Sequence, residues 1–106
     1  MPGGAGGIGA YVVDGFIGPT APSYGTSGPV SNTRYFAGGG GAGSYPMPSA
    51  VAGGVGGGGD GGYGPPYQAS TAGSTNMGGG GGGQAGPASQ DSAGGSGIVI
   101  IRYKFQ

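Results

Sequence analysis

Runs of glycine constrain this chain more than any other feature of its sequence. Glycine accounts for 34 of the 106 residues, with uninterrupted runs at 38–41, 56–59 and 78–83. Glycine loses more backbone freedom on folding than any other residue and brings no side chain to bury, so a glycine-rich chain needs a special reason to be ordered. A conventional core of packed side chains is therefore not expected.

Charge and residue types narrow the classes of function. Charged residues make up 6% of the chain and the formal net charge is zero, whereas about a quarter of an ordinary domain is charged. No electrostatic field therefore attracts nucleic acid or a charged substrate, and the lack of net charge favours self-association. The sequence has no cysteine, no histidine and no paired carboxylates within reach of a nucleophile, so thiolate, acid–base and metal catalysis lack their parts. We expect no enzyme activity, no cofactor, no metal and no nucleic-acid partner.

The sequence also lacks the signals of membrane insertion and of classical export. No apolar run approaches the roughly 18 residues that a membrane-spanning helix needs. Residues 1–3 open no basic stretch followed by an apolar one, as a signal peptide would. We expect no membrane insertion, and an extracellular protein of this kind would leave the cell by lysis, by a non-classical route or as a piece of a larger protein.

Apolar side chains collect at three places, and two of them indicate strands. Residues 8–17 are rich in β-branched and aromatic types, which predicts a short strand with a bend at Asp14-Gly15. Residues 33–37 form the second cluster and run directly into glycine. Residues 97–105 predict a C-terminal strand in which alternation separates a wholly apolar face from a mixed one. The apolar face holds Val99, Ile101, Tyr103 and Phe105, and the mixed face holds Ile98, Ile100, Arg102 and Lys104.

The apolar face of the C-terminal strand needs a cover. An uncharged strand with such a face presents an edge that invites pairing with another copy. The N-terminal apolar residues are the obvious complement, in the same chain or in the next. The expected assembly residues are Ile8, Tyr11, Val13, Phe16, Val99, Ile101, Tyr103 and Phe105.

Between residues 38 and 97 the residues alone leave two states open. No helical period of 3.6 occurs there, and glycine with proline would break an α-helix. The region is either a disordered linker or a set of polyproline-II-type helices packed side by side. Such helices satisfy none of their own backbone groups, so their amides must pair with neighbouring segments, which approach closely only where no Cβ intervenes.

The seven tyrosines divide by their surroundings. Tyr11, Tyr35 and Tyr103 lie in apolar segments and are expected to pack against glycine. The tyrosines in expected turns are candidates for a surface that faces carbohydrate or another subunit, since an exposed aromatic ring can stack on such partners. These candidate receptor-facing residues are Tyr24, Tyr45, Tyr63 and Tyr67.

The sequence from about residue 33 to the end resembles a known family. The stretches are Tyr35–Gly43, Asn76–Gly83 and Gly94–Tyr103, of which the last, Gly-Gly-Ser-Gly-Ile-Val-Ile-Ile-Arg-Tyr, is the most specific. They look like the glycine-rich C-terminal domain of phage tail-fibre and other virion structural proteins. Related adhesins at phage fibre tips form sandwiches of packed polyglycine-II helices whose distal loops bind host receptors, and the resemblance implies that architecture here.

Together these observations predict one glycine-rich, non-helical domain over residues 1–106. It comprises an N-terminal apolar strand and Pro/Ser/Thr loop (1–32), a polyglycine region (33–97) and a C-terminal strand (98–106). Packed polyglycine-II or polyproline-II-type helices would make its body, with a few short β-strands. The expected function is a structural subunit of a viral tail fibre or extracellular filament, located in a virion or outside the cell and assembling as a homo-oligomer or filament.

Two alternatives to this function remain. The first is a receptor-binding adhesin at a phage fibre tip, with a cell-surface carbohydrate or outer-membrane receptor as its partner. The second is a disordered glycine-rich protein.

Overall fold

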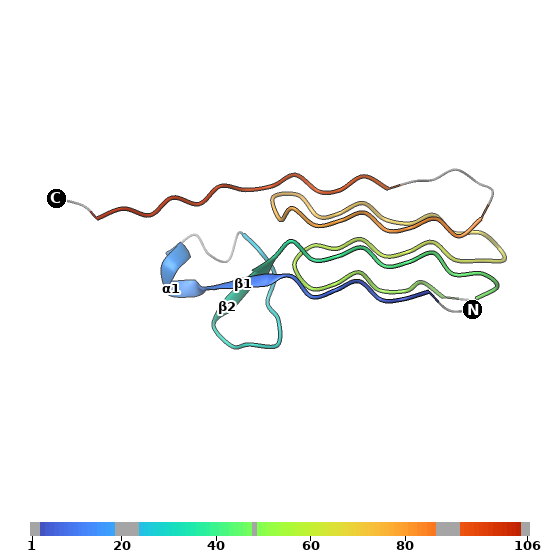
Figure 1. Ribbon diagram of the computed structural model, residues 1–106, viewed down its shortest axis with the longest axis horizontal. Helices are drawn as coiled ribbons and strands as arrows, with labels where there is room; N and C mark the ends of the chain where they lie inside the picture. The colour runs from blue at the N-terminus through green and yellow to red at the C-terminus, as the bar shows by residue number, and fades with distance from the viewer. Residues whose placement is uncertain (1–2, 19–23, 48, 87–91, 105–106) are drawn as a thin grey trace.

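The protein is an elongated rod in a computed structural model that describes residues 3–18, 24–47, 49–86 and 92–104. Its principal axes measure 59 × 23 × 15 Å. Extended segments run back and forth along the long axis, and the two ends of the chain lie at opposite ends of the molecule (Figure 1). A small sheet and a single helical turn sit beside the rod at the end toward which the C-terminal segment extends.

The rod is held together by backbone hydrogen bonds between segments that are far apart in the sequence. These bonds arrange the segments in two layers. Residues 3–9, 37–44, 78–85 and 92–96 form one layer, and residues 51–55, 57–63 and 69–74 form the other. Each segment of the second layer is bonded to two neighbouring segments of the first, so the second layer fills the grooves of the first.

Three segments with the same direction, 37–44, 57–63 and 78–85, form the centre of the rod. Gly41 N donates to Gly59 O, Gly59 N donates to Gly80 O, and Gly80 N donates to Gly38 O, each at 2.9 Å. The same relay repeats three residues further along, from Ser44 N through the carbonyls of residues 62, 83 and 41. The backbone polar groups at the centre are therefore satisfied by neighbouring segments, as buried groups must be.

Glycine backbone fills the place of a side-chain core. Tyr35 is the only buried hydrophobic residue in the described part of the chain. The buried glycines there are Gly38, Gly41, Gly56, Gly57, Gly59, Gly61, Gly62, Gly64, Gly79 and Gly82. A Cβ added at Gly40 or Gly82 would lie 2.0 or 1.9 Å from a carbonyl oxygen of an adjacent segment. Only glycine allows this spacing, which explains why the runs fall where the segments meet.

The N-terminal half of the chain adds a short hairpin-like sheet to the rod. Strands β1 (Ala10–Val13) and β2 (Thr33–Phe36) pair antiparallel, with Tyr11 opposite Tyr35. Both strands are rich in the β-branched and aromatic residues that favour a pleated surface. Tyr35 is 3% exposed, and its ring packs where Gly28 leaves room, because a Cβ on Gly28 would lie 2.4 Å from that ring.

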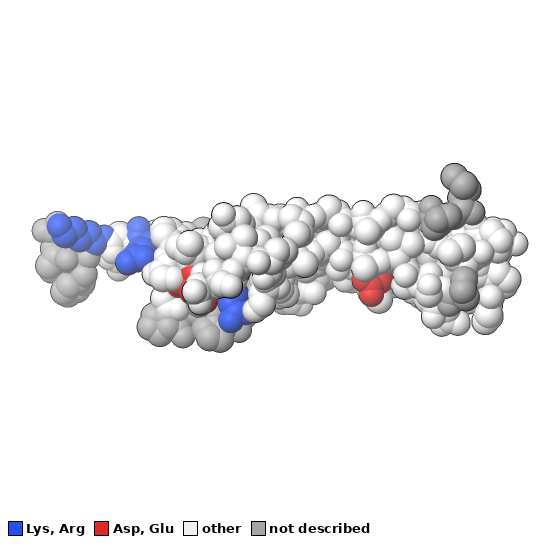
Figure 2. All heavy atoms as spheres, turned by 90° about the horizontal axis from the view of Figure 1, so that it is seen from below, with Lys and Arg blue, Asp and Glu red and all other residues white. Residues whose placement is uncertain are grey.

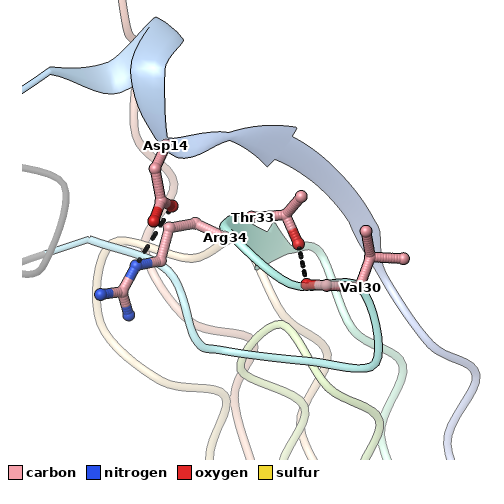
Figure 3. Close-up of polar contacts among 4 residues, drawn as sticks. All are labelled: Asp14, Val30, Thr33 and Arg34. Atoms are coloured by element: carbon pink, nitrogen blue, oxygen red, sulfur yellow. Dashed lines mark hydrogen bonds and ion pairs between the residues drawn. The ribbon is translucent and has the colours of Figure 1, made fainter.

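A single helical turn, α1 (Asp14–Ile17), follows β1 directly. It ends at Gly18, whose φ of 91° is a conformation that residues with a Cβ rarely adopt. Arg34 on β2 lies 3.8 Å from the Asp14 carboxylate, and Thr33 Oγ1 donates to Val30 O at 2.6 Å (Figure 3). The Asp14–Arg34 contact holds α1 against β2, and the bond from Thr33 to Val30 holds the loop that precedes β2.

Two expectations about this region are corrected. The domain is expected to contain no helix, but one helical turn is present: α1 begins at Asp14-Gly15, where the sequence predicts a bend. The sequence predicts an N-terminal strand and loop region over residues 1–32, yet residues 3–9 are hydrogen-bonded into the rod. Gly6 N donates to Ala52 O, and Gly39 N donates to Gly7 O. The cause is the same close backbone approach that orders the later glycine runs.

Candidate assembly surface

The C-terminal segment, residues 97–104, leaves the rod and extends past the sheet (Figure 1). The predicted strand at 97–105 is wrong for these residues, which form no strand within the described chain. A strand needs a neighbour whose backbone completes the ladder. In this chain β1 pairs with β2 instead, so the C-terminal segment lacks a partner strand among the described residues. Phe105 lies outside the described residues.

The side chains of the C-terminal segment nevertheless alternate as the sequence predicts. Val99, Ile101 and Tyr103 are 83%, 79% and 82% exposed, respectively. Ile98 and Ile100 are half-buried and turn toward the sheet. The expectation that Tyr103 packs against glycine is wrong, because the wholly apolar face is the one that points into solvent.

The opposite face of the segment holds it against its own chain. Arg102 Nη1 donates to Gly15 O at 2.8 Å, and its guanidinium carbon lies 5.8 Å from the centre of the Phe16 ring. An open apolar hollow of about 410 Å³ lies between the segment and the sheet. Its lining includes Val12, Phe16, Phe36, Met77, Ile98 and Ile100.

The N-terminal residues predicted for assembly lie on the surface. Ile8, Tyr11, Val13 and Phe16 are 59%, 51%, 55% and 41% exposed. The first three do not line the hollow beside the C-terminal segment, whereas Phe16 does. Phe16 also lines a second hollow together with Tyr103. No strand pairing joins the N-terminal residues to the C-terminal segment among the described residues, and pairing with another copy stays a prediction.

Sequence reasoning missed the residues that anchor the C-terminal segment. Phe36 and Met77 line the hollow, and Arg102 bonds to α1. The alternation places Ile98 and Ile100 on the mixed face, and nothing in the sequence pattern favours that face as the inward one. The signal was available in Arg102, because a long side chain with a charged head can cover an aromatic ring while its guanidinium reaches a carbonyl.

Two of the predicted receptor-facing tyrosines form a stacked pair at the other end of the rod. The rings of Tyr45 and Tyr67 lie 5.8 Å apart with an angle of 18° between their planes, and the side chains are 52% and 42% exposed. Tyr63 is half-buried nearby, in bridges to Ser44 and Gln68. Tyr24 does not join them, because it lines a hollow with Ile17 and the C-terminal segment.

A small hollow beside the stacked pair has both apolar and polar groups in its lining, and the pKa of one phenol of the pair is shifted. Tyr67 lines a hollow of about 160 Å³ together with Gln68, Ser70 and Gln84. Partial burial of the phenol raises the pKa of Tyr67 above its usual value, and the charge of Tyr45 and its hydrogen bond add to that shift. An aromatic face beside amide and hydroxyl groups suits a partner with both apolar and polar faces.

Charged side chains are sparse on the rod. Figure 2 shows Lys and Arg atoms at the end toward which the C-terminal segment extends. The carboxylate of Asp60 accepts a hydrogen bond from Gly53 N at 2.9 Å, so it ties two rod segments together. No metal-binding cluster of acidic, histidine or cysteine side chains occurs within the described ranges. No helix there is long and apolar enough to cross a membrane.

Comparison with known proteins gives one finding. A family model described as "Glycine-rich domain" matches residues 1–104, which includes the N-terminal segment that joins the rod. No curated protein and no solved structure matches the chain.

Proposed function

We propose that this chain, which belongs to the glycine-rich domain family, is a structural subunit of a viral tail fibre or an extracellular filament. The supporting observation is the relay of backbone hydrogen bonds through residues 38, 41, 59 and 80. A body cross-linked in this way by its own backbone keeps its shape without a side-chain core. Such a body suits a mechanical role outside the cell or on a virion.

In this proposal the rod segments are polyglycine-II helices. A helix of that kind has three residues per turn and no internal hydrogen bonds. Donors recur at residues 38, 41 and 44 toward one neighbouring segment, and at 39 and 42 toward another. That interval equals one turn of such a helix, so donors three residues apart would point in the same direction, toward the same neighbouring segment. The interval therefore supports the assignment.

Assembly would use the C-terminal segment. It carries the most exposed large apolar side chains of the described chain, Val99, Ile101 and Tyr103. Large exposed apolar side chains grouped on one face are typical of an interface. The lack of net charge removes the long-range repulsion between copies.

Electron microscopy of the purified chain at several concentrations tests the proposal. We expect uniform fibres or regular oligomers whose amount grows with concentration. Particles that stay at the size of one chain at every concentration would contradict a structural subunit, and the absence of any ordered particle would instead favour a disordered protein.

A receptor-binding tip is the second candidate, and the Tyr45–Tyr67 stack favours it. An exposed pair of aromatic rings at the turns of a rigid rod is a suitable platform for a sugar ring or a loop of a surface protein. Replacing both tyrosines by alanine should then abolish attachment to host cells and leave assembly intact. Tyr24→Ala is the matched control, because Tyr24 lies near the opposite end. Attachment that survives the double replacement would rule out this site.

A further inference from the structure

We propose that the C-terminal segments of two copies pair antiparallel about a two-fold axis that passes beside Ile101. In this register Ile101 stands opposite Ile101 of the other copy, and residues at equal distances before and after Ile101, such as Val99 and Tyr103, stand opposite each other. This inference rests on the proposed function, because it names the partner of the assembling segment and the symmetry of the contact.

The backbone of the segment is free to pair. Among the described residues, no backbone N–H or C=O group of residues 97–104 takes part in a backbone hydrogen bond. The Arg102 contact uses a side chain and therefore leaves the backbone of the segment open. An extended backbone with unused donors and acceptors adds readily to a second strand.

The sizes of the exposed side chains suit the antiparallel arrangement. With Ile101 on the axis, Ile101 faces its own copy, and Val99 faces Tyr103 on both sides. The largest side chain of the face thus stands opposite the smallest, which keeps the combined width of each pair similar. Aromatic and β-branched residues opposite each other are also among the cross-strand pairs that stabilise a sheet.

Charge distinguishes this arrangement from a parallel one. In parallel pairing, Arg102 and Lys104 would each stand directly opposite their own copies, at about 5 Å, where like charges destabilise a sheet. In the antiparallel register, Arg102 stands opposite Ile100 and Lys104 stands opposite Ile98. The two Lys104 side chains are then about 20 Å apart along the strands, at 3.3 Å per residue. The segment has no acidic residue that could offset the repulsion between like charges in the parallel arrangement.

The area of the contact is enough for a specific but weak dimer. Seven paired residues from each copy, with three side chains that are about four-fifths exposed, would bury on the order of 1,000 Å² in total. That is the lower end of specific interfaces, so we expect association that depends on concentration. A two-fold contact closes on itself, so growth into a fibre would need a second contact elsewhere on the rod.

Cysteine cross-linking tests the register, because the chain has no cysteine of its own. Directly opposed residues in an antiparallel pair have Cα atoms about 4.5–5.5 Å apart, within the range that a disulfide spans. Under oxidising conditions we expect Ile101→Cys to form a disulfide-linked dimer and Val99→Cys alone to give only background. A mixture of Val99→Cys with Tyr103→Cys should again form the dimer.

The outcomes separate this inference from the proposed function. Equal cross-linking of all three single variants would indicate parallel pairing and overturn the inference. Failure of Ile101→Cys to cross-link, while the wild-type chain still associates in sedimentation, would overturn the inference and leave the structural role standing. A wild-type chain that sediments as a monomer at every concentration would overturn both.

Discussion

The replacement of Gly82 by alanine tests the packing of the rod directly. Gly82 is buried in the central segment 78–85, and its added Cβ would lie 1.9 Å from Asp60 O. Ordinary contacts begin near 3.5 Å, so the two segments must separate by roughly 1.5 Å. That movement breaks the bonds from Gly59 N to Gly80 O and from Gly62 N to Gly83 O, each 2.9 Å long.

The expected cost is large for a chain of this size. Overpacking costs about 1–3 kcal/mol, and each buried group left without its partner costs about 1–3 kcal/mol more. With one unpaired group for each of the two broken bonds, Gly82→Ala should lower the free energy of unfolding by roughly 3–9 kcal/mol. A domain typically has about 5–15 kcal/mol in all, so much of the variant should be unfolded.

Gly7→Ala is the matched control, because it makes the same chemical change on an outer segment where the added Cβ meets nothing within 4 Å. Its free energy of unfolding should change by less than about 1 kcal/mol, since the alanine mainly restricts the unfolded chain. Urea unfolding followed by tyrosine fluorescence measures both variants, because Tyr35 is buried in the folded chain. Equal stability of the two variants would refute the account of the rod.

Three further predictions follow from single side chains. Ile101→Asp should abolish assembly but leave the rod folded, because Ile101 is 79% exposed; light scattering and circular dichroism separate the two effects. Phenol absorbance should show Tyr67 ionising above the usual value of 10.0, with a lower pKa in Tyr45→Phe. Because the folded-state pKa is raised, the stability that Tyr67 adds should be complete below pH 10 and lost as the pH rises through the raised pKa. Gly28→Ala should lower the melting temperature, because its Cβ would meet the Tyr35 ring.

Residue pattern was a good guide where the structure is local. The β-branched and aromatic residues near Tyr11 and Val12 predicted a strand, and β1 occupies residues within that stretch. The alternation through Val99 and Ile101 was also correct, although the strand itself was not. Alternation depends on the extended backbone alone, whereas a strand depends on a partner that local sequence does not specify.

The arrangement of the glycine segments could not be predicted from the sequence. Gly6 and Gly7 look like any other glycines, yet Gly6 is bonded to Ala52 and Gly7 to Gly39, in segments far along the chain. A residue without a side chain carries no pattern that would identify its neighbour. The same reason explains why the sequence left disorder and packed helices as open alternatives for residues 38–97.

Amide hydrogen exchange measured residue by residue by NMR is the most direct test of the central claim that glycine backbones hold the rod together. The account predicts slow exchange at Gly38, Gly41, Gly59, Gly62, Gly80 and Gly83, whose amides donate across segments. It predicts faster exchange at Gly40 and Gly43, whose amides have no partner among the described residues, and at the exposed Gly97. Uniformly fast exchange through the glycine runs, without this three-residue pattern, would contradict the account.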